Sequence, residues 1–243
     1  MWPAAELIRD EGFALWLGPR YYPALAVVQR VRLRSGEVAG AVRRTRDFVA
    51  RRHYSRVVWQ IGPSATPKTV RKRLHELGMR NDSDPVLKAL ALSEAPVRET
   101  SDVVVRRVDS FDDFERYYEI QQEAFETEPD EVERGRLALR AACEAESKAR
   151  HLTTYLAYID GEPVATARAT FSRAGVGLNG GSTLHAARGR GAYRALVVAR
   201  WDDAVAHGTP YLTTVARPTS YPILKRMGFE DVCDIHSLVD EGF

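Results

Sequence analysis

Hydrophobic residues recur along the chain in two spacings, one typical of helices and the other of strands. Between residues 193 and 205 they follow the i, i+3, i+4 spacing of one buried helical face. The members of this stripe are Tyr193, Leu196, Val197, Trp201, Ala204 and Val205. Between residues 152 and 171, two apolar runs flank Asp160-Gly161, a two-residue signal for a β-hairpin. The pattern therefore predicts a fold that combines helices with sheet strands.

Similar patterns predict the other elements. Helices are predicted over residues 3–17, 67–77, 111–125 and 130–150, and strands over residues 21–34, 38–42, 55–61, 103–108, 176–184, 212–215 and 231–239. Residues 87–92 fit either a strand or a short helix. Thr66 is the predicted N-cap of the helix that begins at Pro67, and Gly78 is its predicted end. Residues 81–85 predict a turn, and residues 93–102 predict a linker between a domain 1–100 and a domain 101–243.

Composition indicates an ordinary globular protein, with 44% hydrophobic and 28% charged residues. Cys143 and Cys233 lie far apart and have no ligand-type neighbours, so we expect buried free thiols and no metal site. The first residues lack the pattern of a signal peptide, and no apolar run is long enough to cross a bilayer. We therefore expect a cytoplasmic protein that does not bind membranes.

The net charge of +2 is unevenly distributed. Residues 20–56 contain ten arginines against two acidic residues, and residues 109–146 contain thirteen acidic residues against four arginines. Such polarity can steer ligands or bring domains together, but runs of charge are more often solvated helix faces and loops, which is the interpretation we favour. Proteins that bind single-stranded nucleic acid stack bases on aromatic side chains. The basic run of residues 43–56 has only Phe48 and Tyr54 for this purpose, so nucleic-acid binding is not expected.

The run Arg188-Gly189-Arg190-Gly191 lies between the strand predicted at 176–184 and the amphipathic helix that follows. Glycine allows close approach of the backbone to a ligand, and the unpaired N–H groups at a helix start point toward that ligand. Together with the helix dipole and two arginines, this turn suits a phosphate group.

This turn, with the strand and the short helix that ends in Lys225-Arg226-Met227-Gly228-Phe229, resembles the GCN5-related N-acetyltransferase (GNAT) superfamily. The pyrophosphate-binding signature of that family is Gln/Arg-x-x-Gly-x-Gly/Ala. Arg188 and Gly191 match its first two fixed positions, and Tyr193 occupies the last one. The resemblance covers about residues 102–243. It implies an α/β fold with a mixed central sheet and flanking helices.

The first half contains a partial echo of this pattern. The strand at 55–61 corresponds to the strand at 212–215. The prolines at 63 and 67 have the same spacing as those at 218 and 222, and Leu77-Gly78-Met79 corresponds to Met227-Gly228-Phe229. We interpret residues 1–100 as a degenerate GNAT-like half that has lost the glycine-rich turn, as in tandem members of the superfamily. A chance likeness between two strand–helix units is the alternative.

The resemblance implies acetyl-coenzyme A as co-substrate. Its pyrophosphate would lie on the backbone of Arg188, Gly189, Arg190, Gly191, Ala192 and Tyr193, and its carrier arm along Ser182, Thr183 and Leu184, with Ser220 near by. Capping of the next helix is the other explanation for Ser220.

The family often uses a strand glutamate as base and a tyrosine four residues before the Gly-Phe pair as acid. Residues 176–184 contain no acidic residue, and Leu224 stands at the tyrosine position. Tyr221 is the substitute we consider for the acid, and His185 for proton relay. A packing role for Tyr221 and a structural role for His185 remain open.

The family builds its acceptor site near the helix predicted at 111–125. Glu119, Glu123 and Glu126 lie on neighbouring turns of that helix, and Glu123 is our first choice to receive a cationic amine. Surface exposure of all three glutamates is the alternative.

The sequence thus predicts an acetyl-CoA-dependent N-acetyltransferase that acts on a primary amine of a small molecule, as a monomer or homodimer. Two alternatives remain: transfer of another acyl or aminoacyl group, and a non-catalytic acyl-CoA-binding or interaction module.

Overall fold

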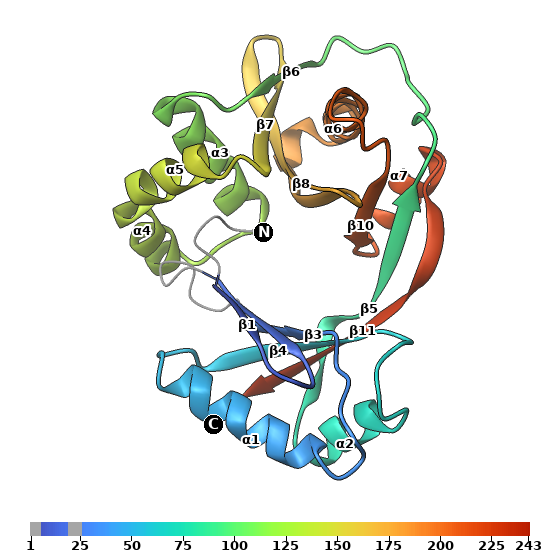
Figure 1. Ribbon diagram of the computed structural model, residues 1–243. Helices are drawn as coiled ribbons and strands as arrows, with labels where there is room; N and C mark the ends of the chain where they lie inside the picture. Colours follow the sequence, from blue (N-terminus) through green and yellow to red (C-terminus); the bar gives the residue numbers. More distant parts are fainter. Residues whose placement is uncertain (1–5, 19–25) are drawn as a thin grey trace. The chain divides into compact units, whose positions relative to one another are not determined.

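The computed structural model describes residues 6–18 and 26–243, and these residues form two compact units (Figure 1). The C-terminal unit comprises Ala89–Val232. The N-terminal unit comprises the described residues up to Lys88 together with Cys233–Phe243. The last strand of the chain therefore belongs to the N-terminal unit. The predicted linker, residues 93–102, contains no helix or strand and lies within the C-terminal unit.

The C-terminal unit contains a mixed sheet with strands in the order β5-β10-β9-β8-β7-β6. β6 (Val104–Arg107), β7 (Leu152–Ile159), β8 (Glu162–Ser172) and β9 (Gly175–Thr183) pair antiparallel, and β10 (Leu212–Ala216) runs parallel to β9. The last residues of β5 (Arg80–Leu92) complete this sheet. The hairpin predicted around Asp160-Gly161 is confirmed.

Helices cover both faces of this sheet (Figure 1). α3 (Phe111–Ala124), α4 (Pro129–Leu137) and α5 (Leu139–Lys148) lie on one side of β7 and β8, and α6 (Ala192–Ala206) lies on the other. α7 (Tyr221–Arg226) follows β10. The single helix predicted over residues 130–150 is wrong, because two helices meet at Ala138. The mixed sheet with flanking helices that the sequence predicted is confirmed.

The core between the sheet and α6 is built from small strand residues and large helix residues. Ala165, Ala167 and Ala169 alternate along β8 and are fully buried, so α6 approaches the sheet closely. Leu196, Val197, Trp201 and Ala204 of the predicted stripe fill this layer. Val205 does not, because half of it is exposed, and its place in the stripe was wrong. Phe125, which follows α3, is also exposed.

The N-terminal unit has strands in the order β1-β2-β3-β4-β11, with β4 (Arg56–Ile61) parallel to β3 (Ala26–Gln29) and antiparallel to β11 (Glu230–Glu241). α1 (Val38–Ala50) and α2 (Val70–Glu76) pack together on one side of this sheet (Figure 1). Trp59 of β4 is fully buried at the centre of this core and faces the ring of Phe13. The unit thus has a hydrophobic core of its own.

The helix predicted over residues 3–17 is wrong in its described part. β1 (Glu6–Arg9) and β2 (Ala14–Leu17) form an antiparallel hairpin. Its turn is held by Asp10, whose Oδ1 accepts a hydrogen bond from the Gly12 N–H at 3.1 Å. This Asp-x-Gly turn favours a hairpin. Residues 3–5 of the prediction and residues 21–25 of the strand predicted at 21–34 lie outside the described residues.

The strand predicted at residues 38–42 is also wrong, because these residues begin α1. The buried side chains of α1 are Val38, Ala41, Val42, Thr45 and Val49, a helical spacing that continues through the arginine-rich stretch. The arginines occupy the other faces of the helix and obscured this period.

Two further predictions in the N-terminal half need correction. Thr66 does not cap α2, whose N-cap is Thr69, because the Thr66 backbone N–H donates to Val31 O at 3.2 Å. Residues 81–85 do not form a turn but lie in β5. Gly78 does end α2, with φ at +94°.

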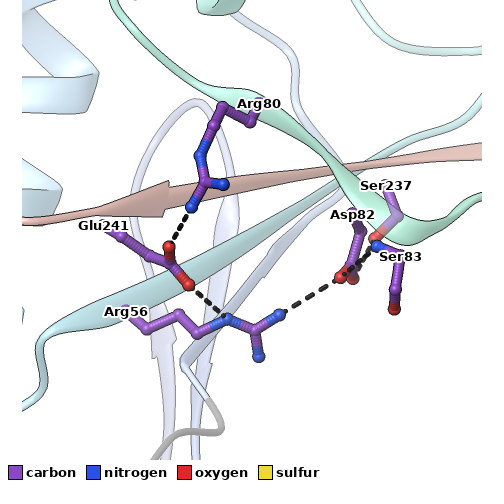
Figure 2. A network of polar contacts seen from close by, with 6 residues as sticks. All are labelled: Arg56, Arg80, Asp82, Ser83, Ser237 and Glu241. Atoms are coloured by element: carbon purple, nitrogen blue, oxygen red, sulfur yellow. Dashed lines mark hydrogen bonds and ion pairs between the residues drawn. The ribbon is translucent and has the colours of Figure 1, made fainter.

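Charged residues join three strands of the N-terminal unit into one polar network (Figure 2). Arg56 of β4 donates to Glu241 Oε1 of β11 at 3.1 Å and to Asp82 Oδ1 of β5 at 3.2 Å. Arg80 binds the other oxygen of Glu241, and Ser237 donates to Asp82 at 3.1 Å. This network pairs the charges of the β5 segment that looked like a turn, so the strand tolerates them.

Among the described residues, no helix has both the length and the apolar character required to span a membrane. Cys143 and Cys233 are free thiols, both half-buried.

Candidate active site

A β-bulge interrupts β9 in the middle of the C-terminal sheet. Thr166 of β8 pairs with Ser182 and Arg168 pairs with Asn179, so two residues of β9, Gly180 and Gly181, lie opposite one residue of β8. The φ of Gly180 is +57°, a conformation that glycine adopts without strain. β10 pairs with β9 only at Val176 and Gly177. Thr214 Oγ1 of β10 still donates to Leu178 O at 3.2 Å, and among the described residues no β10 partner follows along β9, so the edge from Asn179 onward can accept a ligand.

The sequence-predicted phosphate turn follows β9 directly. A 3₁₀ turn at His185–Ala187 leads into Arg188, and Gly191 is the N-cap residue of α6. Gly189 has φ at +80° and Gly191 has φ at +90°, which side chains disfavour. A Cβ atom at Gly189 would meet nothing within 4 Å, and one at Gly191 would meet only the Ser101 Cβ at 3.9 Å. The backbone of the turn is thus open for contact.

Backbone N–H groups at this turn are free. Within the described residues, none of the N–H groups from Gly189 to Arg194 donates to a protein acceptor, and the first bond of the helix is Ala195 N–H to Gly191 O at 3.0 Å. The α6 N-terminus has no side-chain cap. Consecutive unpaired N–H groups and the positive end of the helix dipole together favour an anion. This geometry fits a pyrophosphate.

The arginines of the turn have different partners. Arg190 is paired with Asp160 at 2.9 Å, and Arg194 is paired with Glu99. Arg188 is exposed and has no carboxylate partner among the described residues. Arg188 is therefore the arginine available to a phosphate, in agreement with its place in the family signature.

Tyr193, the departure from that signature, fills the space beside the bulge. A Cβ atom added to Gly181 would lie 2.8 Å from the Tyr193 Cε2 atom, so the ring packs directly over this glycine. Burial raises the pKa of Tyr193, against the opposing effects of the Arg200 guanidinium and a hydrogen bond with Ser220. Tyr193 and Ser220 therefore lie together, close to Gly181.

Gln121 of α3 contacts the opposite side of the bulge. Its Nε2 donates to Gly180 O at 3.1 Å, and its Oε1 accepts from the Tyr117 hydroxyl at 2.7 Å. A Cβ atom at Gly180 would lie 2.9 Å from the Gln121 Nε2 atom. Gln121 thus contacts Gly180 and Tyr193 contacts Gly181, while Gly181 itself stays exposed. Ser182, next to them, has a buried hydroxyl without a hydrogen-bond partner, which a ligand group can satisfy.

A buried ion pair supports the same face of the sheet. Arg168 of β8 binds Glu146 of α5, and its side chain is 4% exposed while that of Glu146 is 9% exposed. The Arg168 guanidinium also donates to Thr154 Oγ1 at 3.2 Å and stacks on the Tyr117 ring at 4.5 Å. Sequence reasoning did not single out this pair. The available signal was an arginine in a strand of alanines and threonines.

Arg200 of α6 is a second buried cation beneath the bulge. Its Nε donates to Leu196 O at 2.8 Å and its Nη1 to Arg168 O at 3.2 Å, whereas its Nη2 has no partner. Burial lowers the pKa of Arg200 from its ordinary value. The positive charge lies near the Tyr193 and Tyr155 hydroxyls. Arg200 was not identified as buried from the sequence, because an arginine within the apolar stripe of a helix is not expected to be buried.

The candidate acid and relay residues lie at the edges of this region. Tyr221 begins α7, and its hydroxyl donates to Asp231 Oδ2 at 3.3 Å, beside the Lys225–Asp231 ion pair. His185 is exposed in the 3₁₀ turn. Ser220 makes no side-chain cap for α7, and its hydroxyl donates to Arg217 O at 3.3 Å. Ser220 thus lies beside Tyr193, and the Tyr221 hydroxyl is engaged by Asp231.

The acidic residues of α3 differ in their surroundings. Glu123 is exposed on the last turn of α3, Glu119 is paired with Arg116 at 2.6 Å, and Glu126 follows the helix with φ at +51°. The side chains of α3 that reach the bulge region are Tyr117 and Gln121.

A cavity of about 310 Å³ adjoins the phosphate turn. It is lined by residues 97–105 on one side and by α6 from Gly191 to Asp202 on the other. The ion pairs Arg98–Asp202 and Arg194–Glu99 hold these two sides together. The turn therefore opens both to solvent and into a cavity.

The C-terminal unit thus combines a mixed sheet with a bulged strand, a glycine-rich turn and a following helix. Residues 89–221 match the family described as the acetyltransferase (GNAT) domain. This stretch is more than half of the 243 residues, so the chain belongs to the GNAT acetyltransferase family. No curated protein matches the sequence.

Solved structures share the fold over nearly the whole chain. A conserved protein of unknown function from Staphylococcus epidermidis ATCC 12228 is 12% identical, with a TM-score of 0.74 and coverage of 100% of this chain and 96% of that one. A GCN5-related N-acetyltransferase from Kribbella flavida is 21% identical, with a TM-score of 0.73 and coverage of 98% and 90%. A tandem GNAT protein from the clavulanic acid biosynthesis pathway is 15% identical, with a TM-score of 0.63 and coverage of 98% and 84%.

Proposed function

We propose that the predicted domain 101–243, apart from residues 233–243 that complete the N-terminal unit, is an N-acetyltransferase domain that transfers the acetyl group of acetyl-coenzyme A to a primary amine of a small molecule. Residues 1–100 are, in this proposal, a degenerate GNAT-like half without a cofactor site. The main support for a cofactor site is the run of free N–H groups from Gly189 to Arg194 at an open, glycine-rich helix start. Acetyl-coenzyme A supplies an activated thioester, so the protein mainly has to bind and orient two substrates.

In this proposal, the backbone and one side chain of the turn bind the pyrophosphate. The N–H groups of Gly189, Arg190, Gly191, Ala192 and Tyr193 bind the pyrophosphate, and the Arg188 side chain adds a positive charge.

The open edge of β9 serves the carrier arm. Ser182, Thr183 and Leu184 lie along this edge, where the arm can also satisfy the Ser182 hydroxyl. Ser220 lies across from them beside Tyr193. Backbone donors aimed at a developing negative charge on the thioester oxygen are the main catalytic contribution expected of this strand.

Proton transfer is assigned to residues at the edge of the site. Tyr221 protonates the departing thiolate in this scheme, which requires its hydroxyl to leave Asp231. His185, exposed beside the phosphate turn, relays the proton of the amine through water. Glu123 attracts a cationic acceptor from the end of α3.

A non-catalytic acyl-CoA-binding module is the second candidate function. It is favoured by two observations: Leu224 stands where the family has its tyrosine, and the Tyr221 hydroxyl is engaged by Asp231. Transfer of another acyl or aminoacyl group is consistent with the same turn.

Thiol release from acetyl-coenzyme A, measured against a panel of cationic and neutral amines, tests the proposal. We expect release with at least one primary amine, and loss of that release in Gly191→Val. Because Glu123 is exposed, Glu123→Gln should weaken only cationic acceptors, by roughly two- to fivefold in kcat/KM. Coenzyme A binding without thiol release from any amine or any acyl thioester would favour the non-catalytic module.

A further inference from the structure

The N-terminal unit contains a cavity of about 570 Å³ that has no part in the scheme above. Three elements of this unit line it: α2, the middle of β5, and β11. Its volume is within the range of small-molecule sites. All of its lining residues belong to the N-terminal unit, so the cavity is complete within that unit.

Basic side chains form one part of the cavity wall. α2 contributes Arg71, Lys72 and His75, and β11 contributes His236. Glu76 is the acidic lining residue, and it is already bound by Arg73 at 2.9 Å and by Lys72 at 3.9 Å. Arg71 has no carboxylate partner among the described residues. An exposed arginine without a partner, next to a lysine and two histidines, attracts an anion.

His236 senses the charge of this cavity. Its pKa is lowered by burial first and by Arg71 second, while Asp234 of the same strand acts in the opposite direction. Asp234 is itself paired with Lys88 of β5 at 2.6 Å. An anion bound beside Arg71 would offset the positive charge that His236 experiences. Binding would therefore raise the pKa of His236.

The cavity also has an apolar part. Pro85 and Val86 of β5 lie in its wall, and Val86 is 36% exposed. A cationic wall next to an apolar one suits a ligand with an anionic head group and an organic body. Arg71 and His75 are four residues apart on α2, so both side chains face the same direction along the helix. Lys72, the residue after Arg71 along α2, also lines the cavity and adds an amine to the same wall.

We propose that this cavity of the N-terminal unit is a binding site for a small organic phosphate, with Arg71, Lys72 and His75 holding the phosphate and Pro85 and Val86 contacting the organic part. The site is independent of the acetyltransferase proposal, because no residue of the phosphate turn takes part in it. It assigns a ligand-binding role to a half of the chain that lacks the glycine-rich turn.

Histidine NMR on the full chain tests the site, with the His236 signal assigned through His236→Gln. Titrations from pH 5 to 8 compare inorganic phosphate with chloride at equal ionic strength. We expect phosphate to raise the pKa of His236. Arg71→Gln should raise this pKa without phosphate and weaken phosphate binding roughly fivefold or more. Lys68→Gln, which removes the same charge just before α2 but outside the cavity lining, should do neither.

Phenyl phosphate tests the apolar wall in the same experiment. It should bind roughly three- to tenfold more tightly than inorganic phosphate, because its ring covers Pro85 and Val86. Absence of a phosphate effect on His236, or equal effects in Arg71→Gln and Lys68→Gln, would overturn the site. Equal affinity for the two phosphates would overturn the role of the apolar wall.

Discussion

Gly181 and Tyr193 depend on each other across the bulge. The Tyr193 ring occupies the volume that a side chain at position 181 would need, since the added Cβ would lie 2.8 Å from Cε2. The φ of Gly181 is not in the left-handed region, so its backbone conformation accepts alanine. The requirement for glycine at this position is therefore set by the tyrosine.

A double-mutant cycle tests this dependence. Gly181→Ala should lower the free energy of unfolding by roughly 1–3 kcal/mol, because a methyl group is forced against the ring. The same substitution in a Tyr193→Ala background should cost much less. Urea unfolding of the four proteins measures the coupling. Equal costs in both backgrounds would mean that the ring does not limit position 181.

The residue-level chemistry was predictable from sequence only where it is local. Arg188 and Gly191 were found because spacing along the chain defines the turn. Gln121, Arg168 and Arg200 were not found, because their partners lie on other elements of the fold. Whether a charged side chain is buried and paired depends on its neighbours in space. Those neighbours are known only once the register of the strands is known.

At the scale of elements, the Arg168–Glu146 pair connects α5 to the centre of the sheet. Both side chains are almost fully buried, so removal of one partner leaves an uncompensated charge in the interior. Attachment of α5 to the sheet therefore depends on a charged contact as well as on hydrophobic packing.

Glu146→Leu should lower the free energy of unfolding by roughly 3–5 kcal/mol, measured by urea unfolding with tryptophan fluorescence. The double variant Glu146→Leu/Arg168→Met should recover much of this loss, because no charge remains buried. A double variant as unstable as the single one would show that packing, and not charge, makes this contact.

Elements of the C-terminal half were predicted better than those of the N-terminal half. β7, β8 and α3 have clear hydrophobic periods, and residues that favour a turn or a helix start mark their ends. Asp160-Gly161 forms the turn between β7 and β8, and the Ser110 hydroxyl caps α3 by accepting from the Asp113 N–H at 3.0 Å. β1 and β2 are strands of four residues joined by a tight turn, which resemble one helix when the turn is overlooked. Short elements carry too few residues to define a period.

At the scale of the whole molecule, residues 233–243 belong to the same unit as the first described strands, β1 and β2. β11 pairs six residues with β4, from His236 opposite Ile61 to Glu241 opposite Arg56, and Leu238 is fully buried in the N-terminal core. Asp240 is 2% exposed, and its carboxylate accepts hydrogen bonds from Nε and Nη2 of Arg46. These hydrogen bonds raise the pKa of Arg46. The N-terminal core is therefore incomplete without the last residues of the chain.

Deletion of residues 233–243 should unfold the N-terminal unit selectively. Hydrogen exchange should show lost protection in β4 and retained protection in β8, because β8 pairs only within the C-terminal unit. Deletion of residues 242 and 243 alone keeps all of β11 and removes only the packing of Phe243 on the core, so it should cost β4 much less protection. Unchanged protection of β4 after the longer deletion would contradict the division of the chain into these units.

Calorimetric titration with coenzyme A tests the central claim most directly, that one cofactor site lies at the turn before α6. The full chain should bind one equivalent. Gly191→Val should lose roughly tenfold or more in affinity, because its side chain strains the turn and obstructs the free N–H groups. Gly208→Val, at the other end of α6 with φ at +69° and open space around it, should bind as the wild type does. Two equivalents per chain, or unchanged affinity in a folded Gly191→Val protein, would contradict the account.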